Sequence, residues 1–197
     1  MKNSGQSPPY TPKESILVNG ELVRFKLLET ADEGALLRFF QRIPDHEREC
    51  LRHDVCDPNT VACWVRDLDY GSVMPVVALD EAGQDIVAVS SLHRKSGVSR
   101  HIGEVRIVVG PSHRKLGLGS SLIKEIVSIG TQQGLFFLRA KIIADNRLAI
   151  KAFRQLGFEY KCILEDFFMT RSGQTRDVVL MLKPLRVNME EDFFYVF

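Results

Sequence analysis

The chain has 197 residues, of which 45% are hydrophobic and 26% are charged, and its formal net charge is +1. This length allows one domain with a full hydrophobic core, and the composition is ordinary for a globular protein. A net charge so close to zero creates no overall field toward DNA or an anionic membrane, and no apolar run reaches the roughly 18 residues of a membrane span. We therefore expect neither nucleic acid nor a membrane as a partner.

The N-terminal stretch MKNSGQSPPYTPKES is rich in Pro, Ser and Gly and contains no apolar segment. Such a composition predicts a disordered leader over residues 1–15 rather than a secretion signal. We expect a single domain over residues 16–186, a tail over 187–197 and a cytoplasmic location. The tail ends in DFFYVF, and apolar residues of this kind are expected to pack on their own domain or on a second copy, which leaves a homodimer open.

The first half of the domain reads as one strand, helices and then three strands. Residues 21–29 alternate as a strand does, and Thr30 with Glu33 forms a capping-box pattern before a helix that reaches residue 40. Pro44 marks a break before helical segments at 45–54 and 60–68. Two strands lie within 74–95, and a third covers 102–110.

The second half continues with a helix, a strand, a helix and a long hairpin. An apolar stripe at Leu118, Leu122, Ile126 and Ile129 predicts a helix that ends at a glycine. Residues 135–143 are nearly all apolar and predict a strand buried on both faces. A short helix ends near residue 157, and a hairpin turns near residues 172–173. The order predicts an α+β fold with a mixed, mainly antiparallel sheet of about seven strands flanked by helices.

Three of the four cysteines fall close together, at Cys50, Cys56 and Cys63, with His53 between the first two. The segment contains no CxxC pair, and these spacings match none of the usual zinc templates. We expect no metal site.

The stretch HRKLGLGSSL, residues 113–122, contains the residue types that bind phosphate. A Walker A loop is excluded because no lysine follows a suitable glycine, and a dinucleotide fingerprint lacks its third glycine at Leu122. The pattern R-x-x-G-x-G remains, formed by Arg114, Gly117 and Gly119. Bare glycine backbone at a helix start offers unpaired N–H groups and a favourable dipole to a pyrophosphate. The alternative is a glycine-rich turn beside solvated cations.

Two segments together resemble one family. The run IGEVRIVVGPSHRKLGLGSSLI, followed by IIADNRLAIKAFRQLGFE, is similar to the GNAT (N-acetyltransferase) superfamily. Members carry an [RQ]-x-x-G-x-[GA] loop after a strand and an N-x-x-A-x-x-x-[YF]-x-x-x-G-F helix, which Asn146, Ala149, Phe153, Gly157 and Phe158 match. The final hairpin is also similar, so the resemblance covers about residues 21–185. The segment LLRFFQRIPDHERECLRHD further resembles acetyltransferase domains near bacterial protein-lysine acetyltransferases.

The resemblance implies a GNAT-like fold and acetyl-CoA as the acyl donor. It implies that the Val109 N–H polarises the thioester carbonyl. Asn146 would contact the pantetheine arm or would only cap its helix. The residues expected to bind the cofactor are Val108, Val109, Arg114, Lys115, Leu116, Gly117, Leu118, Gly119, Ser120, Asn146 and Phe153.

The resemblance also implies a catalytic base, because acetyl transfer needs a neutral amine. Glu104 lies on the strand before the loop, where the superfamily often has this base, and His93 is a second candidate. The alternative for Glu104 is a salt bridge with Arg106 or a neighbour. The proton-donating Tyr of the family corresponds to Phe153, which has no proton to give, so Tyr160 or Ser120 would have to serve.

We therefore predict an acyltransferase that moves acetyl from acetyl-CoA to a primary amine by direct attack in a ternary complex. The acceptor is a small molecule, a protein lysine or a protein N-terminus, and RFFQRIPDHER with DFFMTRSGQTRD is expected to line its groove by analogy. The main alternative is a catalytically weak acyl-CoA sensor of the same fold, which Phe153 favours. A third hypothesis is an NTP-binding protein.

Overall fold

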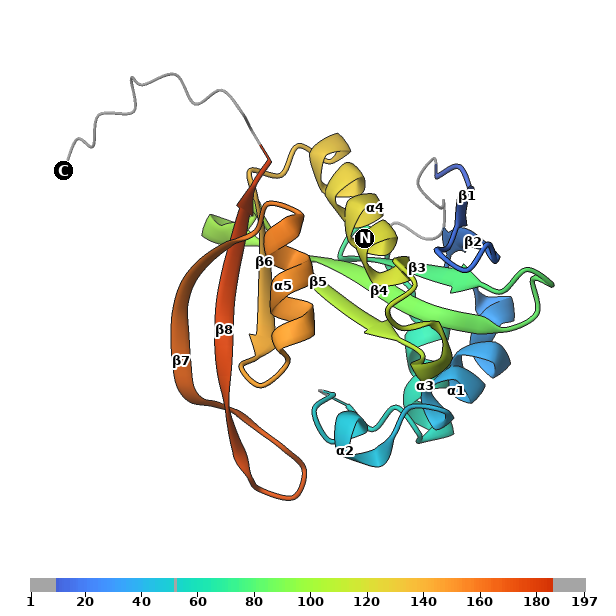
Figure 1. Cartoon of the computed structure of the whole chain (residues 1–197), viewed down its shortest axis with the longest axis horizontal. Coiled ribbons are helices and arrows are strands. Elements are labelled where there is room, and N and C mark those ends of the chain that lie inside the picture. The colour runs from blue at the N-terminus through green and yellow to red at the C-terminus, as the bar shows by residue number, and fades with distance from the viewer. Residues whose placement is uncertain (1–9, 52, 186–197) are drawn as a thin grey trace.

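The computed structural model describes residues 10–51 and 53–185, so the predicted tail lies outside the described residues. Its strands form one sheet in the order β1-β2-β3-β4-β5-β6-β8-β7, in which only β5 and β6 are parallel neighbours (Figure 1). The strands are β1 (Lys13–Ile16), β2 (Leu22–Leu27), β3 (Val73–Leu79), β4 (Ile86–Arg94), β5 (Ile102–Val109), β6 (Phe137–Ile143), β7 (Glu159–Met169) and β8 (Thr175–Pro184).

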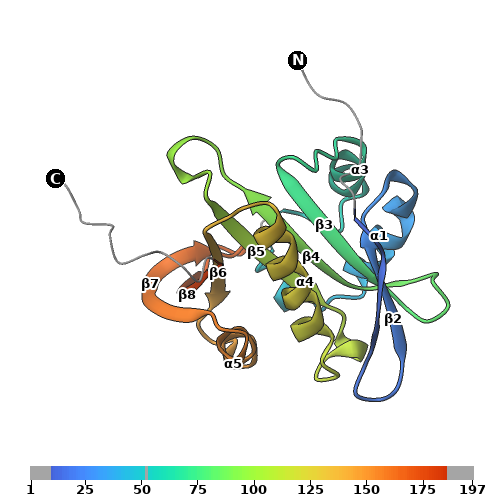
Figure 2. The ribbon, with the colours of Figure 1, turned by 90° about the horizontal axis from the view of Figure 1, so that it is seen from above.

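Five α-helices in the described residues accompany the sheet. α4 and α5 lie on one face, and α1 and α3 cover the other face (Figure 2). The helices are α1 (Glu33–Gln41), α2 (Asp45–Arg48), α3 (Pro58–Arg66), α4 (Leu118–Gln132) and α5 (Arg147–Gln155). This arrangement confirms the predicted α+β class with a mainly antiparallel sheet. None of these helices is both long enough and apolar enough to cross a membrane.

The eighth strand, β1, lies inside the segment predicted as a disordered leader. Lys13–Ile16 pairs with β2, and the Lys13 ammonium lies 2.9 Å from the Glu125 carboxylate on α4. The prediction of a disordered leader is therefore wrong for residues 13–15, which belong to β1. A short edge strand is held mainly by backbone hydrogen bonds, so its polar side chains give no apolar pattern to detect.

Three local predictions differ from the structure. The capping box lies one residue earlier than expected, because Asp32 accepts from the Glu29 N–H at 2.8 Å and Glu29 caps in return. The predicted helix over 45–54 is only one turn, Asp45–Arg48. β6 alternates in burial instead of being buried on both faces, and its outward residues include Arg139 and Lys141.

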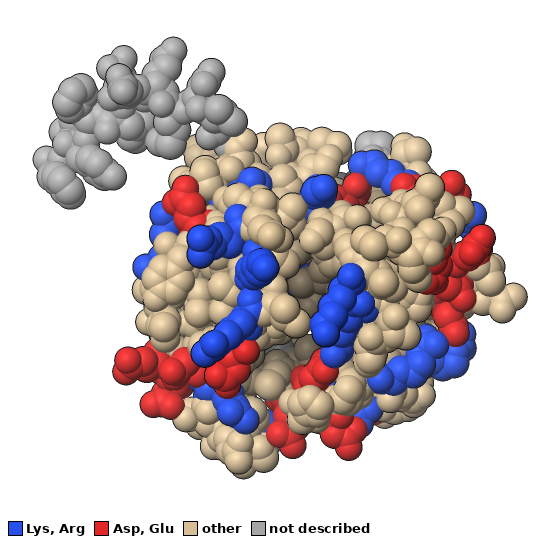
Figure 3. Space-filling view, in the orientation of Figure 1, with Lys and Arg blue, Asp and Glu red and all other residues tan. Residues whose placement is uncertain are grey.

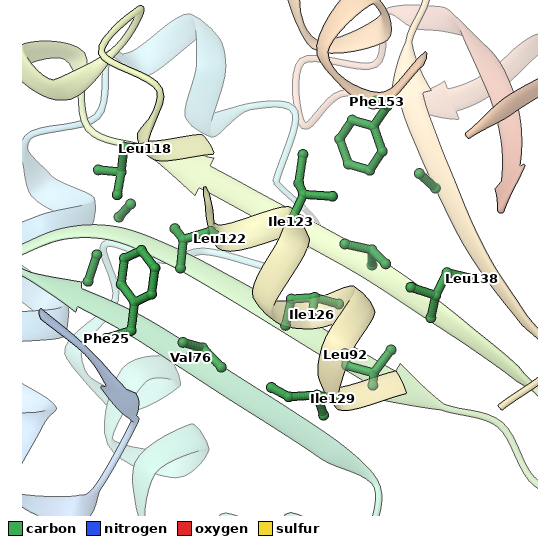
Figure 4. Close-up of a cluster of buried hydrophobic side chains, with 14 of the residues drawn as sticks. Phe25, Val76, Leu92, Leu118, Leu122, Ile123, Ile126, Ile129, Leu138 and Phe153 are labelled. Carbon is green, nitrogen blue, oxygen red and sulfur yellow. The ribbon is translucent and has the colours of Figure 1, made fainter. Parts of the chain in front are cut away.

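The core between the sheet and α4 holds the predicted apolar stripe. Leu118, Leu122, Ile126 and Ile129 are each no more than 4% exposed and pack toward β3, β4 and β5 (Figure 4). Each such side chain stabilises the fold by about 1.5–3 kcal/mol through burial. A second cluster fills the space between the sheet, α1 and α3. Both cores pack against β5, one on each face, and so hold the end of this strand in place.

Candidate functional site

Strands β5 and β6 separate halfway along their length. They pair only from Ile102 with Phe137 to Val105 with Ala140. Beyond that point β5 stays paired with β4 up to Val109, and β6 stays paired with β8 up to Ile143. The second half of β5 therefore has one open edge inside the sheet, which Figure 1 shows as the gap between these two strands.

The register decides which backbone groups face this open edge. The Gly110 N–H donates to Val87 of β4 at 2.9 Å, whereas the His101 carbonyl accepts from Phe136 on the β6 side. Because successive residues of a strand face opposite edges, the amides of Ile107 and Val109 face the side that β6 has left. The amide of Val108 faces β4, where Val108 pairs with Val89. Val108 and Val109 are both expected to bind the cofactor, and of these two it is Val109 whose N–H faces the gap.

The loop after β5 presents a run of amides without acceptors. No hydrogen-bond acceptor among the described residues binds the backbone N–H groups of residues 114 to 120. The first bond of the helix runs from the Ser121 N–H to the Gly117 carbonyl at 3.1 Å. Seven unpaired donors at the start of a 15-residue helix form a site for an anion, because the helix dipole adds positive potential there.

Two backbone positions with positive φ shape this loop. Lys115 has φ 62° and Gly117 has φ 87°, a conformation in which L side chains are strained. A Cβ on Gly119 would lie 3.6 Å from Val109 Cγ2, so the helix start packs directly on the open half of β5. The Leu116 carbonyl accepts from the Val18 N–H at 3.1 Å, which holds the loop against the β1–β2 turn. The fold itself therefore holds the loop that carries these seven amides, which we call the amide run.

Arg114 does not point its guanidinium along this loop. Its Nε donates to the Val109 carbonyl at 3.0 Å, and its two Nη groups donate to the Glu47 carboxylate at 2.7 Å each. The Arg114 side chain, which is expected to bind the cofactor, is thus engaged by groups of the protein in this structure. The side chain instead joins the end of β5 to α2, while its backbone N–H remains one of the seven donors.

These features fit the diphosphate and pantetheine of acetyl-CoA. A diphosphate needs several converging donors and no Cβ in the way, as at Gly117 and Gly119, and an extended amide-containing arm can pair with an open strand edge. The surface is hollowed near the middle of the face drawn in Figure 3, with Lys and Arg side chains on both sides of the hollow. Cations beside such a hollow suit a ligand that carries several negative charges.

Glu104 lies on the face of the sheet opposite α4, at the point where β5 and β6 part. Its Oε1 accepts from Arg106 at 2.9 and 3.2 Å, its Oε2 accepts from Arg139 at 2.7 Å, and the Lys141 ammonium lies 3.9 Å away. Burial raises the pKa of this carboxyl, but the hydrogen bonds and charges of these cations outweigh it and lower the pKa to about 2. The predicted salt bridge is therefore present.

Two further candidates also make structural contacts. His93 pairs in register with Glu104, and its Nε2 lies 2.9 Å from the Ser91 hydroxyl. The Asn146 side chain accepts from the Ala149 N–H at 3.1 Å, so Asn146 caps α5. This cap accounts for the asparagine without any ligand.

Phe153 belongs to the core. It is 3% exposed and meets Phe158 edge to face at 4.9 Å between ring centroids, and it points toward Ile123 in Figure 4. Of the residues suggested as alternative acids, Tyr160 is on β7, separated from β5 by β8 and β6. Ser120 lies in the first turn of α4, beside the amide run.

The second segment expected to wall an acceptor groove contacts the residues that directly follow the first one, which spans residues 38–48. In the hairpin turn between β7 and β8, Arg171 binds the Asp54 carboxylate at 2.8 Å, and the Ser172 hydroxyl donates to Glu49 at 3.2 Å. Both contacts join this turn to the segment around α2. These contacts place the β7–β8 turn beside residues 49–54.

Sequence reasoning missed Glu47 and Arg139. Glu47 lies in a charged helical stretch, and its pairing with Arg114 spans 67 positions of the chain. Arg139 lies in an apolar run whose pattern predicts burial on both faces. A lone arginine in such a strand was the available signal, because it needs an anionic partner when it is half buried.

The matches to known sequences agree with this geometry. The model of the acetyltransferase (GNAT) family matches residues 36–158. The catalytic subunit naa20 of the N-terminal acetyltransferase B complex of Schizosaccharomyces pombe is 28% identical over 90 residues, which are 46% of this chain and 50% of that protein. The [ribosomal protein bS18]-alanine N-acetyltransferase of Escherichia coli strain K12 is 28% identical over 79 residues, 40% of this chain and 53% of that enzyme.

The chain thus spans about half the length of the curated relatives it matches. Among solved structures, that of yncA, described as a putative acetyltransferase from Salmonella typhimurium with its cofactor acetyl-CoA, shares the fold. Its TM-score is 0.70 at 17% identity, over 87% of this chain and 99% of that one. The family match includes the β5 edge, the amide run and α5, and it shows that this chain belongs to the acetyltransferase (GNAT) family.

Proposed function

We propose that the protein transfers the acetyl group of acetyl-CoA to a primary amine, and that the preferred acceptor is an α-amine. The observation that supports this most is the run of seven unpaired amides at the end of an open strand edge. An NTP would also suit the amides. It would not use the open edge of β5, which suits the amide-containing pantetheine arm.

Each part of the site has a distinct role in this proposal. The amides of residues 114–120 hold the diphosphate, and the Ile107 and Val109 backbone binds the pantetheine arm along the β5 edge. The bound donor supplies the thioester. The amine nitrogen attacks the carbonyl carbon, the C–S bond breaks, the thiolate leaves, and the nitrogen loses one proton. The Val109 N–H stabilises the negative charge that develops on the carbonyl oxygen.

The low pKa of Glu104 supports an α-amine over a lysine. A carboxyl with a pKa of about 2 takes up a proton poorly at neutral pH. An α-amine has an ordinary pKa of about 8 and a lysine one of about 10.4, so the α-amine needs far less help to be neutral. We keep Glu104 as the candidate base for a proton relayed through water, and expect its contribution to be small. Both curated relatives are also named for N-terminal or alanine acetylation.

One observation supports the alternative of an acyl-CoA sensor. Phe153, at the position of the family's Tyr, is buried in the core and offers no hydroxyl to the leaving thiolate. In the proposed enzyme this proton comes from water or from Ser120 at the start of α4. In a sensor no such proton is needed, because the donor binds and is not consumed.

The test measures thiol release from acetyl-CoA with matched acceptors. The panel is a peptide with a free N-terminus and no lysine, the same peptide blocked at its N-terminus with one internal lysine, and a small aliphatic amine. Calorimetry with acetyl-CoA alone gives the donor affinity. We expect turnover with the free N-terminus. Turnover with the lysine peptide only would refute the α-amine preference, and donor binding without turnover on any acceptor would support the sensor.

A further inference from the structure

The outer side of α5 carries a row of positive charges. Arg147, Lys151 and Arg154 are four and three positions apart, so they share one side of the helix, and all three are exposed. We call these three residues the basic stripe. None of them forms an ion pair or a side-chain hydrogen bond with any of the described residues. Arg147 is also in the first turn of α5, where the helix dipole disfavours a cation, so the stripe favours an anionic partner.

Exposed apolar side chains of β7 lie beside the basic stripe. Tyr160 and Ile163 are 53% and 49% exposed. They pair with Met181 and Val179 of β8, whose side chains belong to the core under α4 and α5, so they lie on that same side of the sheet. Tyr160 lines one surface hollow together with Arg154, and the basic stripe lines a second. We call the basic stripe together with the two β7 residues the α5 surface.

The described part of the chain ends close to this surface. β8 lies beside the C-terminal end of α5, because a Cβ placed on Gly157 would be 2.7 Å from the Lys183 ammonium nitrogen (Figure 1). Two residues later Leu185, the last described residue, packs against the core on the α4 and α5 side of the sheet. Residues 186–197 therefore start next to the α5 surface.

The sequence of residues 186–197 complements the α5 surface. It reads RVNMEEDFFYVF, in which three consecutive acids precede five aromatic or aliphatic residues. The acids are five to seven residues beyond Leu185, a reach of roughly 17–25 Å in an extended chain. The nine residues of α5 extend for only about 14 Å. The acids can therefore reach each cation of the basic stripe, and the aromatic residues can reach the apolar side chains beside it.

We propose that residues 186–197 bind the α5 surface of their own chain, with the three acids on the basic stripe and the aromatic residues against Tyr160 and Ile163. A phosphate-rich polymer would also suit three cations, but it would make no use of the apolar residues of β7. The covalent connection through Leu185 gives the segment a high effective concentration at this surface, so individually weak contacts suffice. Binding also removes a cluster of aromatic side chains from water. The contact does not depend on acetyl transfer.

Amide hydrogen exchange of the full chain measures this contact. We expect the amides of residues 190–197 to exchange about tenfold or more slowly than those of a synthetic peptide of residues 186–197. Equal exchange rates in the chain and in the peptide would overturn the proposal.

Carbodiimide cross-linking identifies the partners, because this reagent joins a carboxylate to a lysine ammonium that it contacts. We expect links from Lys151 to the acids at residues 190–192. In a mixture of ¹⁵N-labelled and unlabelled chains, a link within one chain carries a single label. Links that mostly combine the two labels would overturn binding within the same chain and would indicate a second copy.

Charge reversal locates the contact on the α5 surface. The double variant Lys151→Glu with Arg154→Glu should bring the exchange of residues 190–197 to the rate of the free peptide, because like charges then face each other. Both side chains are exposed, so the fold should persist, and thermal unfolding checks this. Adding Glu190→Lys and Glu191→Lys to this variant restores the opposite charges and should restore slow exchange.

The matched control is Arg24→Glu with Arg66→Glu, which reverses two exposed cations on β2 and α3, away from α5. It makes the same change in net charge and should leave the slow exchange of residues 190–197 intact. Slow exchange that survives the reversal of the basic stripe, or that is lost equally in the control, would overturn the assignment to the α5 surface.

Discussion

The two halves of β5 carry two polar sites that the sequence marked as functional, and they differ in how their polar groups are satisfied. In the paired half, every oxygen of the Glu104 carboxylate already has a cationic partner. In the open half and the loop beyond it, seven consecutive amides have no acceptor among the described residues. The first arrangement stabilises the protein by itself, whereas the second leaves its donors available to a ligand.

This difference separates structural from binding roles. A satisfied ion cluster lowers the free energy of the folded chain and gains little from a further partner. Donors that a partly strained loop holds in place, without an acceptor in the protein, are available to an anion. We therefore place donor binding in the loop, and assign Glu104 mainly to organising the ion cluster that it forms with Arg106, Arg139 and Lys141.

The largest effect is expected from the loop backbone. Gly117→Val places a β-branched residue at φ 87°, which forces the loop to change and turns several amides away. Because each lost bond to a charged group is worth about 1.5–3 kcal/mol, affinity for acetyl-CoA should fall by at least about 100-fold in calorimetry. Gly134→Val is the matched control, since Gly134 also has positive φ, at 70°, but lies in the turn before β6. Equal losses in both variants would contradict the role of the loop.

The next effect concerns stability rather than binding. Glu104→Gln leaves three cations without their anion and should lower the free energy of unfolding by roughly 3 kcal/mol at neutral pH. Because the folded pKa is depressed, from 4.5 to about 2, this stabilisation is complete above the unfolded pKa and is lost as the pH falls through the folded one. Denaturant titrations of wild type and variant should therefore converge between about pH 4.5 and 2.

Glu14→Gln, which removes an exposed carboxylate on β1, provides the control and should change stability little. A difference between Glu104→Gln and wild type that stays constant down to pH 2 would argue against the ion cluster.

A smaller effect is expected for the ion pair that joins the end of β5 to α2. Arg114→Gln and Glu47→Gln each break the same pair, so the double variant should be no worse than either single variant. We expect a loss of about tenfold in kcat/KM for the acceptor, because α2 is no longer fixed to the end of β5. Additive losses in the double variant would show that the two residues act independently.

The smallest effect tests Asn146. Asn146→Ala removes the cap of α5 and should lower stability by about 1 kcal/mol, while Asn146→Asp keeps a capping oxygen and should restore it. Thermal unfolding measures both variants. Loss of acetyl-CoA affinity in both, with stability restored in the Asp variant, would instead support contact with the pantetheine arm.

The sequence predicted most of the fold because its periodic patterns are local. The stripe of α4, the hairpin near residue 173 and the order of elements all follow from neighbouring residues. It did not predict β1, because the polar side chains of this strand give no apolar pattern and backbone hydrogen bonds hold it in the sheet. It also could not show the separation of β5 from β6, because this depends on which strands each one pairs with far along the chain.

For the site, the sequence indicated the glycine loop but not the direction of its side chains. Arg114 fits the phosphate motif by spacing, and only the structure shows it bound to Glu47. Glu104 was found by position, yet its pKa depends on Arg139 and Lys141 from another strand. Charge clusters assembled across a sheet leave no spacing signal within one segment.

Amide hydrogen exchange over residues 114–120 tests the central claim most directly, with acetyl-CoA compared with pantetheine, which has no diphosphate. If these amides bind the diphosphate, saturating acetyl-CoA slows their exchange strongly, while pantetheine slows only the open edge of β5. Unchanged exchange of this segment at saturating acetyl-CoA would contradict the account.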